Sequence, residues 1–437
     1  MMTKPIIPMQ AFASRRERLL QQIGNKLLIL PANKELIRNR DCTFPFRQDS
    51  DFLYLTNFNE PDAVMVLDGK AQKSILFSKP YDELHAIWEG EIIGQERAKS
   101  EYLFDEAYPI EELETALLKY CYAYDTIISP FSRYAEFDNV LLKLVKQAKD
   151  TRRAKAPQNW LNSDQFIHPM RLQKDEYEIA MMQHSADVSV EAHKQAMRQT
   201  KPGMNESELA ALFDYEFSKA GGSAAYTHIV AAGNNACTLH YNDNNCVIKE
   251  NDLILIDAGS EIEGYAADIT RTYPACGKFT EPQKRVYEWV LKSMEAAIAE
   301  CKVGNTIRSP HFAAEDVLIE AMLDLGLLTG DINSIKEGKA HEKYFMHGTS
   351  HWLGIDVHDV GDYHNENDEW LTLQSGMVLT IEPGLYIRED DMDAPEELRG
   401  IGVRIEDDIV ITDDGYLNLT KATPKTVADI EAMCQSS

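Results

Sequence analysis

Residues 253–274 read LILIDAGSEIEGYAADITRTYP, and this stretch decides the expected fold of the second part of the chain. The unbroken apolar run Leu253–Ile256 predicts a strand that is buried on both faces and that ends at an acid, Asp257. Turn residues follow at 261–264, and the chain then returns as a second strand-like run that carries Asp268. If the turn is centred between Ile262 and Glu263, the two acids lie directly opposite each other, with Cβ atoms about 4.5–5.5 Å apart.

Two carboxylates held that close at the end of a buried strand repel each other unless a cation lies between them. A pair of metal ions about 3.5–4 Å apart would fit this arrangement. The simpler alternative is an exposed hairpin that carries two solvated acids, because ionised acids are rarely buried without a partner. Asp257 and Asp268 are therefore the first candidates for a metal site.

The chain has 437 residues, which is too long for one ordinary hydrophobic core, so two domains are expected. Its net charge of −27 would repel phosphate backbones, and this argues against nucleic-acid binding. Seven cysteines are scattered without paired spacing, as is typical of a reducing compartment. No apolar run has the length of a membrane span, and the first residues lack the apolar core of a signal peptide, so we expect a cytoplasmic protein with no membrane contact.

Residues 1–170 predict an α/β domain, because short apolar runs alternate with segments of helical spacing. The expected strands are Lys26–Leu30, Phe52–Leu55, Ala63–Leu67, Ser74–Ser78 and Thr126–Ser129, and the expected helices are Glu111–Tyr122 and Arg133–Ala148. The polar stretch 150–164 has no period and contains Pro157, so it is expected to link this domain to the next.

Residues 171–437 predict a second domain in which one pattern occurs twice. Its first copy has expected helices over about 179–200 and 205–221, strands around His240 and the hairpin described above. Its second copy has expected helices over about 280–301 and 310–326, followed by strands Val378–Ile381 and Val403–Ile411. Two copies of helix–helix–sheet predict an α+β domain of two pseudo-symmetric halves that share a central sheet, with a site at their junction.

The second copy also contains groups that bind metals. Histidines stand at positions 347, 351 and 358 of the segment MHGTSHWLGIDVHD. A single histidine is more often an ordinary core or surface residue, but three within twelve positions favour a site. Glu382 ends the apolar run Val378–Ile381 and so repeats the arrangement of Asp257 at the end of a buried strand.

Arg404 and Glu406 are two residues apart in GIGVRIEDDIVIT, so they lie on one face of the expected strand. They form either a surface ion pair that contributes about 0–1 kcal/mol or a metal-bound carboxylate with a neighbouring cation. The candidate ligands are then Asp257, Asp268, His351, Glu382 and Glu406. Four oxygen donors with one imidazole suit two divalent ions, of which Mn²⁺ is plausible and Zn²⁺, Co²⁺ and Fe²⁺ are compatible. The lack of thiolates argues against a structural zinc site.

These motifs, taken in order, resemble those of the pita-bread metallopeptidases. The matching residues are the Asp in IDAG, the Asp in ADITRT, the His in HGTSHWLG, the Glu in IEPG and the Glu in RIEDD. The domain ahead of them, together with the segments PFRQDSDFLYLTNFNEPDA, HWLGIDVHD and RGIGVRIEDDIVIT, is most similar to the proline-specific branch, the bacterial Xaa-Pro aminopeptidases (aminopeptidase P). The resemblance covers nearly the whole chain. It implies a pita-bread (creatinase/aminopeptidase) domain over 171–437 that releases the N-terminal residue from peptides with proline in the second position.

The same resemblance implies the metal ligands. Asp257 would bind one Mn²⁺, His351 and Glu382 would bind the other, and Asp268 and Glu406 would bridge the two.

It implies roles for the remaining residues as well. Glu382 would pass a proton to the leaving nitrogen, and His240 and His358 would stabilise the oxyanion and position the peptide. His347, Arg404 and Tyr226 would bind the substrate. Relatives often form dimers or tetramers, in which Asp41 and Trp88 would reach another subunit's site.

Three alternatives stay open at this point. A prolidase has the same metals and chemistry but is confined to X–Pro dipeptides, and its pocket beyond proline is closed. A non-catalytic peptide-binding module has the same fold but has lost ligands, whereas all five are present here. The intact ligand set equally disfavours a relative that hydrolyses creatine without metal.

Overall fold

The computed structural model describes residues 3–150 and 155–436, and the chain forms two compact units. The N-terminal unit is Ile7–Arg171, and the C-terminal unit consists of Leu172 and the residues after it, together with the first few residues of the chain. Among the described residues, no helix combines the length and the apolar character needed to cross a bilayer.

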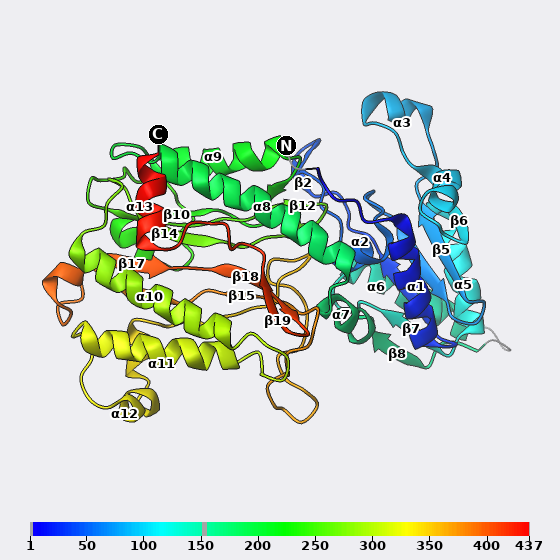
Figure 1. Ribbon diagram of the computed structural model, residues 1–437. Helices are drawn as coiled ribbons and strands as arrows, with labels where there is room; N and C mark the ends of the chain where they lie inside the picture. The colour runs from blue at the N-terminus through cyan, green and yellow to red at the C-terminus, as the bar shows by residue number, and fades with distance from the viewer. Residues whose placement is uncertain (1–2, 151–154, 437) are drawn as a thin grey trace. The chain divides into compact units, whose positions relative to one another are not determined.

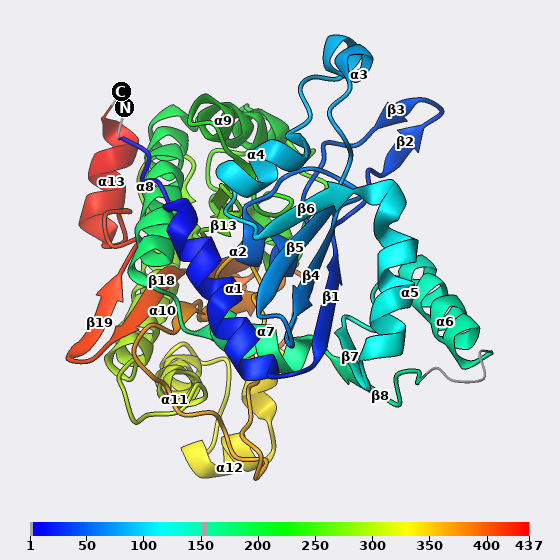
Figure 2. The same cartoon turned by 90° about the vertical axis from the view of Figure 1, so that its right-hand side faces the viewer.

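The N-terminal unit is built on one six-stranded mixed sheet (Figure 2). In spatial order its strands are β6 (Glu106–Pro109), β5 (Lys73–Ser78), β4 (Val64–Asp68), β1 (Leu27–Pro31), β7 (Thr126–Ser129) and β8 (Asn159–Asn162). The pairs β1–β4 and β4–β5 are antiparallel, and the other pairs are parallel. The expected α/β domain is therefore confirmed.

Helices cover both faces of this sheet (Figure 2). They are α1 (Met9–Ile23) and α2 (Ser50–Thr56) on one face, and α5 (Leu113–Ala123) and α6 (Ala135–Lys149) on the other. Leu117 and Leu144 pack with Ile29 and Val66 in one buried cluster, because alternate residues of a strand point to the same face. The remaining elements are β2 (Ile37–Asn39), β3 (Cys42–Thr43), α3 (Glu83–Trp88), α4 (Gly94–Ser100) and α7 (Asp164–Leu172).

One strand predicted in this unit, Phe52–Leu55, is wrong, because these residues lie in helix α2. The Asp49 side chain accepts a hydrogen bond from the Phe52 backbone N–H at 2.9 Å and so caps the first turn. Phe52 and Leu55 are three residues apart and both buried, as on one face of a helix. A four-residue apolar run does not distinguish the two structures by period alone.

The predicted linker 150–164 is wrong over its second part. Residues 151–154 lie outside the described residues. Asn159–Asn162 form β8, which pairs in parallel with β7, and Asp164 begins α7. None of the four residues of β8 is fully buried, so this edge strand has the polar sequence of a connection.

The C-terminal unit repeats one order of elements (Figure 1). The first copy comprises α8 (Glu176–Gln199), α9 (Glu206–Lys219), β9 (Ser223–Ala224), β10 (Ile229–Ala232), β11 (Leu253–Asp257), β12 (Ser260–Ile262), β13 (Tyr265–Ala266) and β14 (Thr270–Pro274). The second comprises α10 (Glu281–Ala299), α11 (Ser309–Asp324), α12 (Ile332–Glu337), β15 (Val378–Ile381), β16 (Gly384–Ile387), β17 (Ile401–Arg404), β18 (Asp407–Thr412) and β19 (Gly415–Asn418), and α13 (Val427–Gln435) follows. The predicted duplication of helix–helix–sheet is confirmed.

Each copy contributes its own small sheets to the unit, and no sheet among the described residues contains strands of both copies, so the predicted shared central sheet is wrong. Strands β10, β11 and β14 form one sheet and β15, β18 and β19 another, and both send side chains into the same large buried cluster. Capping boxes at Asn205 and Thr280 start α9 and α10, two of the predicted helices. His240 follows the short helix Gly233–Cys237 and lies in a loop, so the strands expected around it are limited to β10 ahead of it.

The hairpin forms, but its register differs from the predicted one. The turn is centred on Glu263 and Gly264, which have φ values of 51° and 85°, as the tight turn between twisted antiparallel strands requires. Asp257 therefore pairs with Thr270 and not with Asp268. Asp268 comes to lie beside Gly259, where a Cβ would be 1.7 Å from the carbonyl oxygen of Ala267.

The strand predicted over Val403–Ile411 is two strands of two different sheets. Strand β17 pairs with β16, and β18 pairs with β15. Glu406 stands between them, where the chain passes from one sheet to the other, and its backbone N–H donates to the Thr270 carbonyl of the first copy at 3.1 Å. Glu406 thus lies at the junction of the two halves.

Candidate metal centre

One cavity of about 490 Å³ in the C-terminal unit is lined by all ten site residues predicted from the sequence. These residues are Tyr226, His240, Asp257, Asp268, His347, His351, His358, Glu382, Arg404 and Glu406. Asp257 ends β11 in the first copy, and Glu382 directly follows β15 in the second. The cavity therefore receives an acid from a buried strand of each half, as the repeated sequence pattern predicted.

Tyr226 connects the first two acids. Its hydroxyl lies 2.6 Å from Asp257 Oδ1 and also within hydrogen-bonding distance of Asp268 Oδ1. The two carboxylates share this one group although they are not opposite each other in the hairpin. Burial and the two acids raise the pKa of Tyr226 well above its ordinary value, so the hydroxyl keeps its proton.

His351 presents one ring nitrogen to the acids. Its Nδ1 lies 3.0 Å from the Trp352 carbonyl oxygen, which can only accept a hydrogen bond, so Nδ1 carries the proton in the neutral ring. Its Nε2 lies 3.4 Å from Asp268 Oδ2 and 3.7 Å from Glu382 Oε1. A backbone carbonyl that orients the other nitrogen is the usual arrangement around a metal-binding histidine.

A residue of the first copy, Thr270, holds the Glu406 side chain in place. The Thr270 hydroxyl donates to Glu406 Oε2 at 2.7 Å and accepts from Arg404 Nε at 3.1 Å. One oxygen or nitrogen from each of Asp268, His351 and Glu406 lies within 4.8 Å of the others, which is close enough for all three to hold one ion.

Arg404 and Glu406 do not form the surface ion pair considered from the sequence. Both side chains are buried, and Arg404 Nη2 pairs with Asp257 Oδ2 at 2.6 Å. Arg404 Nη1 also lies 3.2 Å from the Tyr386 hydroxyl. Arg404 is the one arginine among the described residues that line the cavity, so it offsets a single negative charge.

The other carboxyls of the cavity resist ionisation in the chain by itself. Burial, reinforced by Asp257, raises the pKa of Asp268, and burial with Asp268 raises the pKa of Glu406 well above its usual range. Burial raises the pKa of Glu382 to about 7 against the opposing effect of His351. Burial alone would lower the pKa of His351, but its contact with Asp268 raises it to about 9.

Three further histidines face the same cavity. The His358 ring lies edge-on to the His351 ring with centroids 4.4 Å apart, and burial lowers the pKa of His358. Burial and Arg404 lower the pKa of His347 to about 4, so this ring is neutral at pH 7. His240 lines the cavity from its exposed loop.

Two residues of the site were missed in the sequence. Tyr386 on β16 is buried and its hydroxyl lies 2.8 Å from His347 Nε2, so it joins His347 to Arg404. Thr270 supports Glu406 as described above. The sequence contained a signal for Thr270, because it is two residues after Asp268 and therefore on the same side of an extended chain. No comparable signal marked Tyr386.

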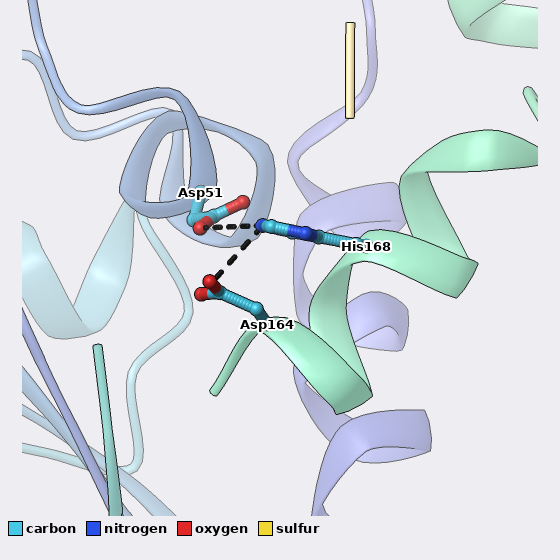
Figure 3. Close-up of side chains that lie close together, drawn as sticks. All are labelled: Asp51, Asp164 and His168. Carbon is cyan, nitrogen blue, oxygen red and sulfur yellow. Dashed lines mark ion pairs between the residues drawn. The ribbon is translucent and has the colours of Figure 1, made fainter. Parts of the chain in front are cut away.

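A second group of potential ligands lies in the N-terminal unit. Asp51, Asp164 and His168 also place one ligand atom each within 4.8 Å of the others, and Figure 3 shows one ring nitrogen of the imidazole facing both carboxylates. His168 Nε2 is 3.6 Å from Asp51 Oδ2 and 3.6 Å from Asp164 Oδ1. Arg171 pairs with Asp51 at 2.7 Å, and Arg133 pairs with Asp51 at 2.8 Å and with Asp164 at 2.9 Å. These acids are already neutralised by guanidinium groups.

The donor set of the cavity in the C-terminal unit fits divalent cations. Four carboxylates converge there with one arginine and one oriented imidazole, and three of the carboxyls have raised pKa values. Oxygen and imidazole donors without thiolates suit ions such as Mn²⁺ or Zn²⁺.

The chain matches known proteins over nearly its whole length. The model of metallopeptidase family M24 matches residues 180–413, and that of the aminopeptidase P N-terminal domain matches residues 12–128. A solved Pseudomonas aeruginosa aminopeptidase structure is similar with a TM-score of 0.96 and 42% identity over 98% of both chains. The Xaa-Pro aminopeptidase of Escherichia coli K12 is 39% identical over 98% of both chains. A structure of zinc-substituted E. coli aminopeptidase P in complex with product has a TM-score of 0.94 at 39% identity, with 98% of both chains covered.

The N-terminal unit thus corresponds to the aminopeptidase P N-terminal domain, and the duplicated C-terminal unit has the pita-bread fold of these enzymes. With its family match centred on the unit that contains the cavity, the chain belongs to metallopeptidase family M24.

Proposed function

We propose that this protein is an Xaa-Pro aminopeptidase, which hydrolyses the first peptide bond of peptides whose second residue is proline. The observation that carries the proposal is the single cavity in which four carboxylates and one imidazole from both halves of the C-terminal unit converge. The name of the E. coli relative, Xaa-Pro aminopeptidase, supports this choice of substrate within family M24.

We propose that each subunit binds two Mn²⁺ ions. Asp257 would hold one ion, His351 and Glu382 would hold the other, and Asp268 and Glu406 would serve both. Such ions, when bound, supply Lewis acidity that lowers the pKa of a water toward about 7 and polarises a carbonyl group. The similar E. coli structure with zinc in place of its usual metal supports a divalent site of this type.

Glu382 is the carboxylate that we assign to proton transfer. Its side chain is 20% exposed, whereas Glu406 is 2% exposed and already accepts a hydrogen bond from Thr270. Glu382 can therefore reach a proton in the cavity and pass it to the leaving proline nitrogen. That nitrogen must be protonated because the amine leaves poorly as an anion.

His240 and His358 are assigned to the developing oxyanion and to the position of the peptide. Both residues are exposed and line the cavity, so their rings can reach a bound peptide. His358 has a lowered pKa and is neutral at pH 7, so it can donate a hydrogen bond without bringing a fixed charge.

Three residues that line the cavity are assigned to the substrate pocket, and they differ in their contacts: His347, Arg404 and Tyr226. Since Nδ1 of neutral His347 donates to the Gly348 carbonyl at 2.7 Å, its Nε2 accepts from the Tyr386 hydroxyl. Arg404 and Tyr226 are engaged with Asp257, so we assign them to holding this carboxylate at the edge of the substrate pocket.

The choice of proline follows from its chemistry. An X–Pro bond has a tertiary amide nitrogen without an N–H, and its ring restricts the residue before it. A site that recognises a ring and polarises the carbonyl can cleave this bond, whereas one that relies on the amide donor cannot.

The test is hydrolysis of an X–Pro–Y tripeptide with added Mn²⁺ and, separately, with EDTA, with release of X as the readout. Metal-dependent release of X supports the proposal. A marked preference for X–Pro dipeptides would indicate a prolidase. Absence of cleavage of either peptide by metal-loaded protein would favour the non-catalytic binding module.

We also infer a cytoplasmic homo-oligomer, a dimer or tetramer, that has peptides and no nucleic acid as partners. Trp88 and Ile87 on α3 are 81% and 77% exposed, and Asp41 lies in the exposed turn between β2 and β3. Large apolar side chains grouped on one short helix are suited to contact with another subunit. Analytical ultracentrifugation of the full chain and of Trp88→Ala tests this assignment.

A further inference from the structure

The two halves of the C-terminal unit meet along a seam, formed by residues 268–272 of the first copy and 404–408 of the second. Asp268 N–H donates to Asp408 Oδ2 at 3.1 Å, Glu406 N–H to the Thr270 carbonyl at 3.1 Å, and Arg404 N–H to the Thr272 hydroxyl at 3.2 Å. Of these three hydrogen bonds between described residues, only the one from Glu406 to Thr270 joins main chain to main chain. Side chains therefore replace a regular β ladder at the place where ligands from both halves must be aligned.

Arg271 closes this seam on the side away from the cavity. Its side chain is fully buried, and its Nη1 donates to the carbonyls of Thr270 at 2.9 Å and Glu406 at 2.5 Å. These are the main-chain groups of the two residues whose side chains bond each other in the metal centre. The arginine thus ties together the two strands directly behind the predicted bridging carboxylate Glu406.

The Arg271 guanidinium is itself fixed by three further acceptors. Its Nη2 pairs with Asp407 Oδ1 at 2.6 Å and lies 3.3 Å from the Thr423 carbonyl, and its Nε donates to the Pro424 carbonyl at 3.0 Å. A buried guanidinium is costly unless its donors are satisfied, and here each of its three nitrogens has an acceptor. Rotation of this side chain would break several charge-assisted bonds at once.

Asp407 connects the guanidinium to residues beyond β19. The Asp407 carboxylate is fully buried, with Oδ1 on Arg271 and Oδ2 facing Lys425. Lys425 Nζ forms an ion pair with Asp407, and Asn418 Nδ2 donates to the same carboxylate at 2.6 Å. The Tyr287 hydroxyl on α10 in turn holds the Lys425 carbonyl at 2.7 Å.

We propose that Arg271, fixed by Asp407 and the segment Thr423–Lys425, is a positioning residue for Glu406, so that this segment is a functional part of the metal centre although it contributes no ligand. The inference rests on the proposed metal site. It predicts that changes in Thr423–Lys425 alter metal affinity, because groups that orient metal ligands typically affect affinity by about 10–100-fold.

The experiment measures Mn²⁺ affinity of the folded full-length protein by titration calorimetry. Arg271→Lys keeps the charge but loses the planar fork, and Lys425→Met removes one of the two cations on Asp407. Lys421→Met is the matched control, because Lys421 is an exposed lysine on the same stretch of chain. We expect Mn²⁺ binding to weaken about 10–100-fold in Arg271→Lys, severalfold in Lys425→Met and not at all in Lys421→Met.

A second readout separates positioning from general stability. The visible absorption spectrum of the Co²⁺-loaded protein reports ligand geometry, and it should change in Arg271→Lys but not in Lys421→Met. Wild-type Mn²⁺ affinity and Co²⁺ spectrum in both folded Arg271→Lys and folded Lys425→Met would overturn the inference. If Arg271→Lys does not fold, Lys425→Met decides, because the Lys425 side chain is partly exposed and its loss leaves Arg271 in place.

The result also distinguishes this inference from the proposed function. If the wild-type protein binds no divalent metal, the proposed metal site is wrong and the inference falls with it. If the wild type binds Mn²⁺ and the variants bind it equally well, only the inference is wrong.

Discussion

Two clusters in this molecule satisfy the same geometric criterion for a metal site, yet they differ in charge. Asp268, His351 and Glu406 in the C-terminal unit, like Asp51, Asp164 and His168 in the N-terminal unit, bring two carboxylates and a histidine within 4.8 Å. Around Asp51, two arginines lie within 2.8 Å of the carboxylate oxygens. Around Asp268 and Glu406 stand two more acids, Asp257 and Glu382, and of these four described acids Arg404 forms an ion pair with Asp257 alone.

The difference is visible in the protonation of the acids. Burial alone would raise the pKa of Asp51, but His168, Arg171 and Arg133 bring it well below its usual range. The pKa values of Asp268 and Glu406 are raised instead, because burial and neighbouring acids act together. Ligand geometry is therefore insufficient to identify a metal site, and an unbalanced negative charge is the second requirement.

The largest effect that tests this comparison is expected in Asp268→Asn. The substitution preserves shape but removes a charge that both ions are proposed to share, so activity should fall by more than the roughly 100-fold typical of an outer-shell change. Metal content should fall with it while circular dichroism stays native. Unchanged turnover would refute the two-metal assignment.

Asp51→Asn should have the opposite pattern. Arg171 would keep its burial and lose its closest carboxylate partner, and breaking a buried ion pair from one side costs about 3–5 kcal/mol. We expect a lower free energy of unfolding by chemical denaturation, with the Mn²⁺ content per chain unaltered. Loss of bound metal in this variant would mean that the N-terminal cluster is a metal site after all.

A change of pH should have an intermediate effect, on how strongly Mn²⁺ stabilises the protein. The pKa of Glu382 is raised from 4.5 to about 7 and that of His351 from 6.5 to about 9 in the chain by itself. Each protonated group stabilises the metal-free fold at pH values below its pKa in the unfolded chain. This stabilisation is lost as the pH rises through the folded-state pKa, about 7 for Glu382 and about 9 for His351. Divalent ions bind the deprotonated groups, so the stabilisation by Mn²⁺ should grow from pH 5.5 to 8.5.

Thermal unfolding with and without Mn²⁺ across this range measures the effect. Calorimetric titration in two buffers of different ionisation enthalpy gives the number of protons released. A Mn²⁺-induced shift in Tm that shrinks with rising pH would contradict the assigned protonation states.

The smallest effect is expected in His168→Gln. The imidazole is 22% exposed and 3.6 Å from each acid, and the arginines already neutralise both carboxylates. Neither contact is as short as a hydrogen bond, so the free energy of unfolding should fall by less than about 1 kcal/mol. The same substitution at His351 serves as the comparison, because there it should remove most of the bound Mn²⁺.

The ends of the buried strands could be predicted from the sequence. A strand that is buried on both faces has a continuous apolar run, as in Leu253–Ile256 and Val378–Ile381, and the run stops where the strand ends. Asp257 and Glu382 follow these runs directly, which is why they could be placed at the cavity. Asp268 was assigned the wrong partner, because the register depends on the backbone conformation of Glu263 and Gly264. The composition of the turn does not reveal that conformation.

Other features depend on contacts between distant residues and could not be predicted locally. Helix α2 was taken for a strand because its cap, Asp49, and its apolar residues form too short a pattern. The contact of Tyr386 with His347 and Arg404 joins one loop and two strands, over separations of 39 and 18 residues. The strand break at Glu406 arises because two sheets compete for the flanking residues, which no local period records.

The position of Glu406 at the junction has a consequence for protein synthesis. Asp257 and Asp268 are translated long before Glu382 and Glu406, and folding domains tend to form in the order in which they leave the ribosome. The growing chain therefore lacks a complete set of ligands until nearly all of the C-terminal unit has been made. A peptidase assembled in this order is inert while it is being synthesised.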